Sequence, residues 1–258
     1  MQRLIGRAAL VTGGGSGIGE ATALRLAAEG ALVMVADVDE DRAAAVAKTV
    51  VSAGGRAEAI RTDVRHRAEV DSAVAATVEA FGRLDILHNN AGVGSILPVV
   101  ALDEATVDRL LDVNVKGVVH GMAAAAPIML AAGSGSIVNT ASAAATFGAP
   151  LQVLYSGTKG AVVSLTRAAA MEFAPAVRVN AVCPGGVRTR FVEAAIGGPP
   201  PDTLEELAAK VHPLGRIAEP SEIAAAVAFL ASDDASFVTG VALAVDGGMT
   251  AGARLDLA

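Results

Sequence analysis

The fold is decided by the stretch Ala8-Ala9-Leu10-Val11-Thr12-Gly13-Gly14-Gly15-Ser16-Gly17-Ile18-Gly19, near the start of the chain. Its first five residues are an apolar run, which is typical of a strand buried on both faces. The apolar periodicity of residues 21–29 predicts a helix directly after the glycines. A glycine-rich turn between such a strand and helix lets backbone N–H groups approach an anion. For this motif alone, a tight turn that holds no ligand stays open.

Short apolar runs alternate with longer amphipathic stretches along the rest of the sequence. This alternation predicts an α/β fold of the Rossmann type, with a doubly wound parallel sheet and helices on both faces. Each run is short and poor in polar alternation, so we expect every strand to be buried on both faces. The seven expected strands lie near residues 8–12, 32–37, 57–62, 86–89, 136–140, 178–182 and 242–245.

One segment breaks the alternation. Between Val187 and Arg216 the chain runs through Gly197-Gly198-Pro199-Pro200-Pro201 into a short amphipathic piece, Leu204 to Lys210. We expect a mobile substrate-loop insertion over one end of the sheet, with a plain disordered loop as the open alternative. Nothing else resembles a linker, so residues 1–258 are expected to form a single domain.

Composition excludes several classes of protein. The chain has 258 residues, 53% of them hydrophobic, which excludes an intrinsically disordered protein. A formal charge of -7 and 3% aromatic residues argue against nucleic acid as a partner. One cysteine excludes a disulfide scaffold and favours the reducing cytoplasm. No apolar h-region precedes the first strand and no apolar run has the length of a membrane span, so no membrane partner is expected.

Asp37 ends the second expected strand, 18 residues beyond Gly19. A carboxylate at this place can accept hydrogen bonds from both hydroxyls of an adenosine ribose, which selects NAD as the cofactor. A 2′-phosphate would meet its negative charge, and neither Ser16 nor Val38 supplies a compensating cation. The alternative is that Asp37 only caps the next helix.

Tyr155, the only tyrosine, and Lys159 stand four residues apart in an expected helix and so share one face. A phenol has a pKa of about 10, and a nearby ammonium favours the phenolate and brings proton transfer within reach. Taken alone, the pair could equally be an exposed Tyr and Lys on a helix surface.

These residues belong to a larger set that resembles the compact subtype of the short-chain dehydrogenase/reductase family, over essentially the whole chain. The matching segments are Thr12 to Gly19, Asp63-Val64, Asn89-Asn90-Ala91-Gly92, Asn114, Ser142, Tyr155-Ser156-Gly157-Thr158-Lys159, Pro184-Gly185 with Thr189, and Gly240 to Gly248. The resemblance implies the strand order 3-2-1-4-5-6-7 and a homotetramer. Departures include small residues at Gly157 and Gly186 and a connection before the sixth strand that is about one residue short.

The resemblance also implies the catalytic roles. Tyr155 is the expected general acid/base, and Lys159 is expected to lower its pKa and to bind the nicotinamide ribose. Ser142 is expected to hold the substrate oxygen, and Asn114 to position a water in a proton relay. Hydride transfer to a carbonyl leaves charge on oxygen, so a proton donor and a fixed hydroxyl are also what the chemistry needs. Without the family, Ser142 and Asn114 would read equally well as turn or capping residues.

The cofactor site follows in the same way. Asp63 is expected at the adenine amino group, Val187 at the carboxamide, and Thr189 at the nicotinamide end. The full set expected to bind NAD is Gly13, Ser16, Gly17, Ile18, Gly19, Asp37, Asp63, Val64, Asn90, Ala91, Gly92, Tyr155, Lys159, Pro184, Gly185, Val187 and Thr189.

The substrate pocket leaves weaker signals. Its expected walls are Gly94, Ala144, Gln152, Gly186 and Phe191. No metal is expected, because the histidines at 66, 88, 120 and 212 are scattered and lie beside no carboxylate cluster. The cysteine at 183 is expected to be a small buried residue rather than a nucleophile.

The sequence therefore predicts an NAD-dependent oxidoreductase that interconverts a small-molecule secondary alcohol and a ketone. A 3-oxoacyl-thioester reductase of the same family is the first alternative, although Asp37 disfavours the NADP that such enzymes commonly use. A non-catalytic NAD-sensing module is the second, although it would have no need of a proton donor. Substrate, direction and stereochemistry depend on the shape of the pocket.

Overall fold

The computed structural model describes residues 2–191, 206 and 210–252. One parallel sheet runs through it in the order β3-β2-β1-β4-β5-β6-β7, which confirms the predicted fold class and strand order. The strands are β1 (Ala8–Thr12), β2 (Leu32–Asp37), β3 (Arg56–Arg61), β4 (Ile86–Asn89), β5 (Gly135–Thr140), β6 (Val177–Pro184) and β7 (Ala242–Val245). Four of these match the predicted ranges at both ends, and β6 is the one that extends farthest beyond its predicted range.

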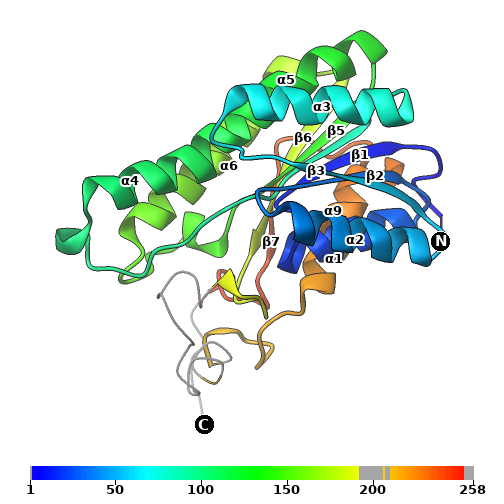
Figure 1. Cartoon of the computed structure of the whole chain (residues 1–258). Helices are drawn as coiled ribbons and strands as arrows, with labels where there is room; N and C mark the ends of the chain where they lie inside the picture. The colour runs from blue at the N-terminus through cyan, green and yellow to red at the C-terminus, as the bar shows by residue number, and fades with distance from the viewer. Residues whose placement is uncertain (1, 192–205, 207–209, 253–258) are drawn as a thin grey trace.

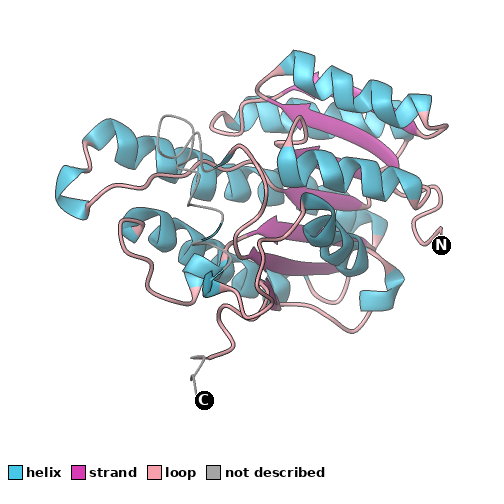
Figure 2. Cartoon of the chain, turned by 90° about the horizontal axis from the view of Figure 1, so that it is seen from below, coloured by secondary structure: helices cyan, strands magenta, loops and turns pink. Residues whose placement is uncertain are grey.

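Helices cover both faces of the sheet (Figures 1 and 2). The helices are α1 (Gly17–Ala28), α2 (Glu40–Ser52), α3 (Arg67–Phe81), α4 (Glu104–Leu111), α5 (Gly117–Ala132), α6 (Val153–Phe173) and α9 (Pro220–Ala231). On one face α3, α5 and α6 bury a cluster around Leu10, Leu87 and Ile137. On the other, α1, α2 and α9 bury Val11, Val33 and Leu26. Burial of these apolar faces is the main favourable term for this architecture.

Acids cap the helices where the sequence predicts them. The Asp39 carboxylate accepts from the backbone N–H of Arg42 at the start of α2, and Asp103 accepts from that of Thr106 at the start of α4. Proline opens α9 behind a capping box between Glu219 and Glu222. These caps fix the ends of helices that begin at the carboxyl edge of the sheet.

One expectation about burial is wrong. The strand β3 is not buried on both faces, because it lies at the edge of the sheet and exposes Arg56, Glu58 and Arg61.

The helical segment Glu104–Ala132 is long and apolar enough, by length and composition alone, to cross a membrane. Within this fold its α5 part packs on α3, α6, β4 and β5, as a core helix does.

Most of the predicted substrate-loop insertion cannot be compared with the structure. Residues 192–205 and 207–209, including the proline run, lie outside the described residues. The described residues before this gap end at Phe191, and those after it begin at Lys210, with residue 206 described between them.

Candidate functional site

The glycine-rich turn between β1 and α1 is packed too closely for side chains. A Cβ on Gly13 would lie 2.8 Å from the Cα of Ala91, and one on Gly19 would lie 2.0 Å from the Gly13 carbonyl oxygen. Gly13 and Gly17 also have φ angles of 61° and 55°, which disfavour other residues. Ser16 precedes α1 without a side-chain cap, so its hydroxyl and the helix N–H groups suit an anion.

Asp37 lies directly against this turn. Its Oδ2 accepts from the backbone N–H of Gly15 at 2.9 Å, and its Oδ1 accepts from the N–H of Asp39 at 3.0 Å. The side chain is half-buried, and each oxygen keeps a further lone pair. This arrangement suits the predicted acceptor of two ribose hydroxyls.

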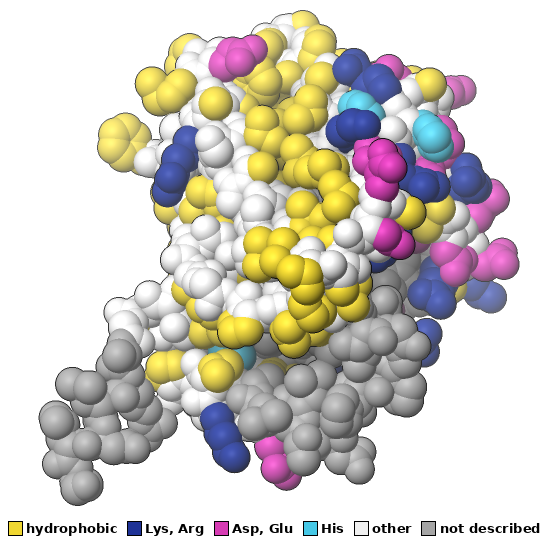
Figure 3. All heavy atoms as spheres, turned by 90° about the vertical axis from the view of Figure 1, so that its left-hand side faces the viewer, with side chains coloured by type: hydrophobic (Ala, Val, Ile, Leu, Met, Phe, Trp, Pro, Cys, Tyr) yellow, Lys and Arg dark blue, Asp and Glu magenta, His cyan; other side chains and the backbone are white. Residues whose placement is uncertain are grey.

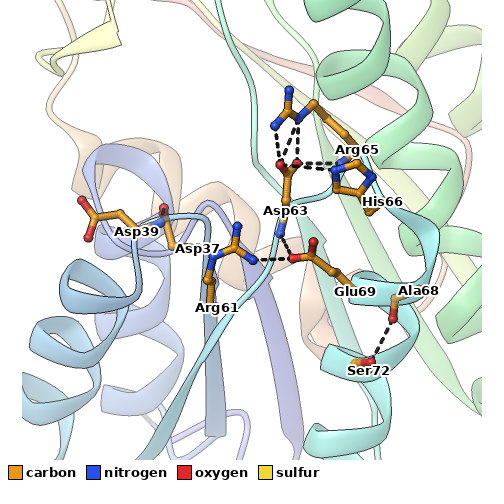
Figure 4. Close-up of polar contacts among 9 residues, drawn as sticks. All are labelled: Asp37, Asp39, Arg61, Asp63, Arg65, His66, Ala68, Glu69 and Ser72. Atoms are coloured by element: carbon orange, nitrogen blue, oxygen red, sulfur yellow. Dashed lines mark hydrogen bonds and ion pairs between the residues drawn. The ribbon is translucent and has the colours of Figure 1, made fainter.

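Asp63, the expected adenine contact, is already bonded to a residue that sequence reasoning missed. The Arg65 guanidinium donates to both of its oxygens, from Nε at 2.9 and 3.0 Å and from Nη2 at 2.6 Å (Figure 4). These hydrogen bonds from Arg65 hold the pKa of the buried Asp63 carboxyl below its usual value. An adenine amino group would have to share this carboxylate with Arg65. No signal in the sequence pointed to the pairing.

Val64 faces α5 rather than an open pocket. Its side chain packs against Gly117, and its carbonyl accepts from Nδ1 of His120 at 2.9 Å. Asn90 is another residue that is expected to bind the cofactor. Its side-chain amide donates to the carbonyls of Thr12 and Gly13 at 3.2 and 3.1 Å. Asn90 therefore ties the end of β4 to the glycine-rich turn.

The four expected catalytic residues lie together. Ser142 lies close enough to the Tyr155 phenol to lower its pKa, and Lys159 Nζ lies 5.8 Å from the centre of the tyrosine ring. A Cβ on Gly92 would lie 3.4 Å from Asn114 Oδ1 and 3.5 Å from Lys159 Nζ, so these two groups approach the same point. The pair Tyr155 and Lys159 is therefore not an exposed helix surface.

Burial governs the pKa values of this group. It raises the pKa of Tyr155 to about 12, and the hydrogen bond with Ser142 opposes the rise. It lowers the pKa of Lys159 to about 8. The expected lowering of the Tyr155 pKa by Lys159 does not dominate, because the ammonium donates to the Thr140 carbonyl at 2.8 Å instead. The phenol is thus protonated at neutral pH, the form that can donate a proton.

Asn114 sits in a π-helical turn, η2 (Asp112–Lys116), which joins α4 to α5. Its side chain is fully buried, accepts from Val93 N–H at 2.8 Å, and donates to Val93 O at 2.9 Å and to Thr158 Oγ1 at 3.1 Å. Such turns occur mostly at functional sites, because they displace a residue from the regular ladder. Both side-chain N–H groups of Asn114 are therefore engaged, and its Oδ1 keeps one lone pair for the expected water.

The segment after β6 returns to the glycine-rich turn. The Thr189 methyl lies 3.1 Å from where a Cβ on Gly17 would be. Thr189, which is expected at the nicotinamide end of the cofactor, therefore lies beside the glycine-rich turn. A second missed residue, the buried His212, accepts the N–H of Gly186 on Nε2 at 2.9 Å. Pro184 is buried, and Gly185 and Val187 lie on either side of this bond, half-buried.

The expected pocket walls are small or aromatic. Gly94 and Ala144 are buried, and Gln152 precedes the first turn of α6. The Phe191 ring lies 5.6 Å from that of Tyr155, centre to centre, at an interplanar angle of 54°. Phe191 is therefore placed to contact whatever approaches the Tyr155 hydroxyl.

Two other titratable side chains, Cys183 and His88, border this site. Within residues 2–191, 206 and 210–252, no three His, Cys, Asp or Glu side chains gather as a metal site would require. Cys183 is buried, and its pKa is raised by that burial. His88 is fully buried, and burial lowers its pKa to about 3, so it stays neutral and bonds Thr140 through Nε2 at 2.9 Å.

Comparisons with known proteins agree with this geometry. A family model described as enoyl-(acyl carrier protein) reductase matches residues 13–250. The chain is 44% identical over 254 residues to 2,5-dichloro-2,5-cyclohexadiene-1,4-diol dehydrogenase of Sphingobium indicum, covering 97% of this chain and 100% of that one. It is 44% identical over 247 residues to cis-4-hydroxycyclohexanecarboxylate dehydrogenase of Sinomonas cyclohexanicum, covering 95% and 97%.

A solved structure has the same fold. Levodione reductase superposes with a TM-score of 0.92 at 39% identity, over 97% of this chain and 100% of that chain. With the strand order, the glycine-rich turn and the Ser142, Tyr155 and Lys159 cluster, these matches identify the chain as a member of the short-chain dehydrogenase/reductase family of oxidoreductases.

Proposed function

We propose that the protein is an NAD-dependent dehydrogenase that interconverts a secondary alcohol on an aliphatic ring and the corresponding ketone. The observation that carries the proposal is the grouping of Tyr155, Ser142 and Lys159, with Lys159 Nζ 5.8 Å from the centre of the tyrosine ring. A sensor of redox state would need no such proton donor next to a bound nicotinamide.

When bound, NAD supplies the acceptor and donor of hydride at its nicotinamide ring. The residues of the chain handle the proton and the oxygen. Tyr155 is protonated at neutral pH, so it can donate a proton to the oxygen of a ketone that becomes an alcohol. Ser142 fixes that oxygen by a second hydrogen bond. In the direction of oxidation, Tyr155 must first lose its proton, and the Lys159 ammonium favours the resulting phenolate.

Asp37 supports NAD over NADP. Its carboxylate stands at the end of β2 with lone pairs for two ribose hydroxyls, and it would repel a 2′-phosphate. The glycine-rich turn and the uncapped first turn of α1 suit the pyrophosphate.

A ring-shaped substrate is supported by the walls around Tyr155. Gly94 and Ala144 are small, and Phe191 gives an apolar flat surface at the tyrosine ring. The names of the two curated relatives both specify a hydroxylated six-membered carbon ring. We infer that the chain forms a single domain, in which the described residues at the two ends of the 187–216 segment border this pocket.

The test is a substrate panel. Initial rates with NAD and with NADP are measured for cyclohexanol, 4-substituted cyclohexanols, linear secondary alcohols and, in the reverse direction, a 3-oxoacyl thioester. The proposal predicts the highest kcat/KM for a ring alcohol with NAD. The family model's description keeps the thioester reductase as the second candidate, and a preference for the thioester with NADPH would select it.

We also propose that the enzyme works as a homotetramer in the cytoplasm. Hydrophobic side chains gather on the face that carries α4 (Figure 3). Exposed large hydrophobic residues include Val99, Val100, Leu111, Val119, Val153 and Met171. Apolar patches of this kind are typical of subunit contacts. Light scattering of the purified protein measures the mass directly.

A further inference from the structure

Three arginines surround the strand ends that carry Asp37, and each is paired with its own acid. Arg42 Nε lies 3.0 Å from Asp39 Oδ2. Arg61 lies 2.9 Å from Glu69, and Arg65 lies 2.6 Å from Asp63 (Figure 4). Asp37 differs from these acids, since it accepts from the backbone N–H groups of Gly15 and Asp39. The expected adenosine end of the cofactor site is therefore rich in cations that are already engaged.

Arg42 lies beside the same glycine of the turn as Asp37. A Cβ on Gly15 would lie 2.9 Å from Asp37 Oδ2 and also 2.9 Å from Arg42 Cβ. Asp37 and the base of the Arg42 side chain thus both pack against Gly15. Because Arg42 stands in the first turn of α2, the sequence around Asp37 gave no indication of a cation there.

Asp39 holds Arg42 by two separate bonds. Its Oδ1 accepts from the Arg42 backbone N–H at 3.1 Å and caps the helix. Its Oδ2 pairs with the Arg42 guanidinium, which is about half exposed, at 51%. The first bond needs only an oxygen acceptor, whereas the second needs the negative charge. A residue that keeps the cap but lacks the charge would release the guanidinium alone.

A 2′-phosphate on the adenosine ribose would need such a guanidinium. It carries nearly two negative charges and three acceptor oxygens, which arginine matches well. In this chain it would meet Asp37 directly, and the neighbouring cation would be held by Asp39.

We propose that Asp39 is a positioning residue for cofactor specificity: it holds the Arg42 guanidinium away from the ribose 2′ position, so that Asp37 and Asp39 together exclude NADP. The inference rests on the proposed use of NAD, and it adds a second acid and a cation to the single carboxylate that the sequence indicates.

The experiment compares Asp37→Ser, Asp37→Ser with Asp39→Ser, and the same double variant with Arg42→Ala. Serine at 39 keeps a helix cap and removes the charge, and Asp39→Asn serves as a second variant with the same property. The dissociation constant of NADPH is measured by its fluorescence, with KM and kcat for both cofactors. Thermal denaturation checks that each variant is folded.

The double variant is expected to bind NADPH about fivefold more tightly than Asp37→Ser, because one repulsive charge is lost and one cation is gained. Adding Arg42→Ala is expected to remove that gain. The matched control is Asp41→Ser in the Asp37→Ser background, since Asp41 is exposed on the same helix. It removes an equal charge and is expected to change NADPH binding less than twofold.

Equal NADPH affinity in Asp37→Ser and the double variant would overturn the inference and leave the NAD dependence intact. A gain that survives Arg42→Ala, or that Asp41→Ser reproduces, would also overturn it, because the effect would then be one of net charge. A wild-type preference for NADPH would overturn the proposed NAD dependence itself, and the inference with it.

Discussion

The two ends of the site recognise their ligands by different physical means. At the adenosine end, Asp37, Asp39 and Arg65 lie at or after strand ends. Asp39 is paired with Arg42 and Arg65 with Asp63, whereas Asp37 accepts from backbone N–H groups. At the catalytic end, Lys159 is buried and donates to a backbone carbonyl, and Tyr155 pairs with a serine. Charge selects the ligand at the first end, whereas burial tunes proton affinity at the second. Substitutions at the two ends should therefore change different kinetic constants.

The largest expected effect is that of Tyr155→Phe. Removing the hydroxyl removes the proton donor and leaves the ring contact with Phe191, so kcat should fall by about a thousandfold. NADH binding, followed by fluorescence, should change little. Turnover near the wild-type level would remove Tyr155 from the mechanism.

Asp37→Ala should change KM for NAD rather than kcat. It removes a charged acceptor of two ribose hydroxyls, so KM for NAD should rise by about tenfold to a hundredfold. The value of kcat at saturating NAD should stay within about twofold, because the reacting groups are untouched. A fall in kcat without a change in KM would contradict the division between the two ends.

Lys159→Met should abolish turnover and yet raise stability. The ammonium is buried and its pKa is lowered to about 8, so the folded state disfavours the charge that the lysine carries at pH 7. The gain in free energy of unfolding should be on the order of 1–2 kcal/mol, after the lost bond to Thr140 is subtracted. Urea denaturation at several pH values measures it.

The lowered pKa of Lys159 also determines the direction in which stability changes with pH. Between about pH 8 and the ordinary lysine value of 10.5, the unfolded state holds more protons than the folded state, so wild-type stability rises with pH. The advantage of Lys159→Met should therefore shrink across this range. Lys48→Met, at an exposed position of α2, is the control and should show no such trend. A difference in stability between Lys159→Met and wild type that stays constant across this pH range would contradict the lowered pKa of Lys159.

Arg65→Ala should have the smallest effect on stability. Arg65 keeps the pKa of Asp63 low, which stabilises the fold above the ordinary carboxyl pKa and less so as pH falls through it. The variant should melt slightly below wild type at pH 7, and the two melting curves should converge below about pH 4. Scanning calorimetry at both pH values tests this, with Lys48→Ala as the exposed control.

Much of the fold and of the catalytic group could be predicted from the sequence. Buried parallel strands such as β1 and β2 are predominantly apolar runs, so their ranges follow from composition. The glycine-rich turn and the pair Tyr155 and Lys159 are local patterns, and local spacing places them on one element. The family resemblance then supplied Ser142 and Asn114.

The remaining features depend on contacts between distant segments. The pairing of Gly186 with His212 joins two sides of an insertion, and no periodicity reports it. The exposure of β3 depends on its place at the sheet edge, which composition does not encode. Arg42 reaches Asp37 only because α2 turns back beside the glycine-rich turn. Such contacts require the tertiary structure.

The central position of β1 has a consequence for synthesis on the ribosome. This strand pairs with β2 on one side, and on the other with β4, where Ala9 stands opposite Ile86. Until β4 leaves the exit tunnel, the nascent chain therefore carries a mostly apolar strand with one open edge. A prematurely terminated chain that ends before Ile86 should aggregate.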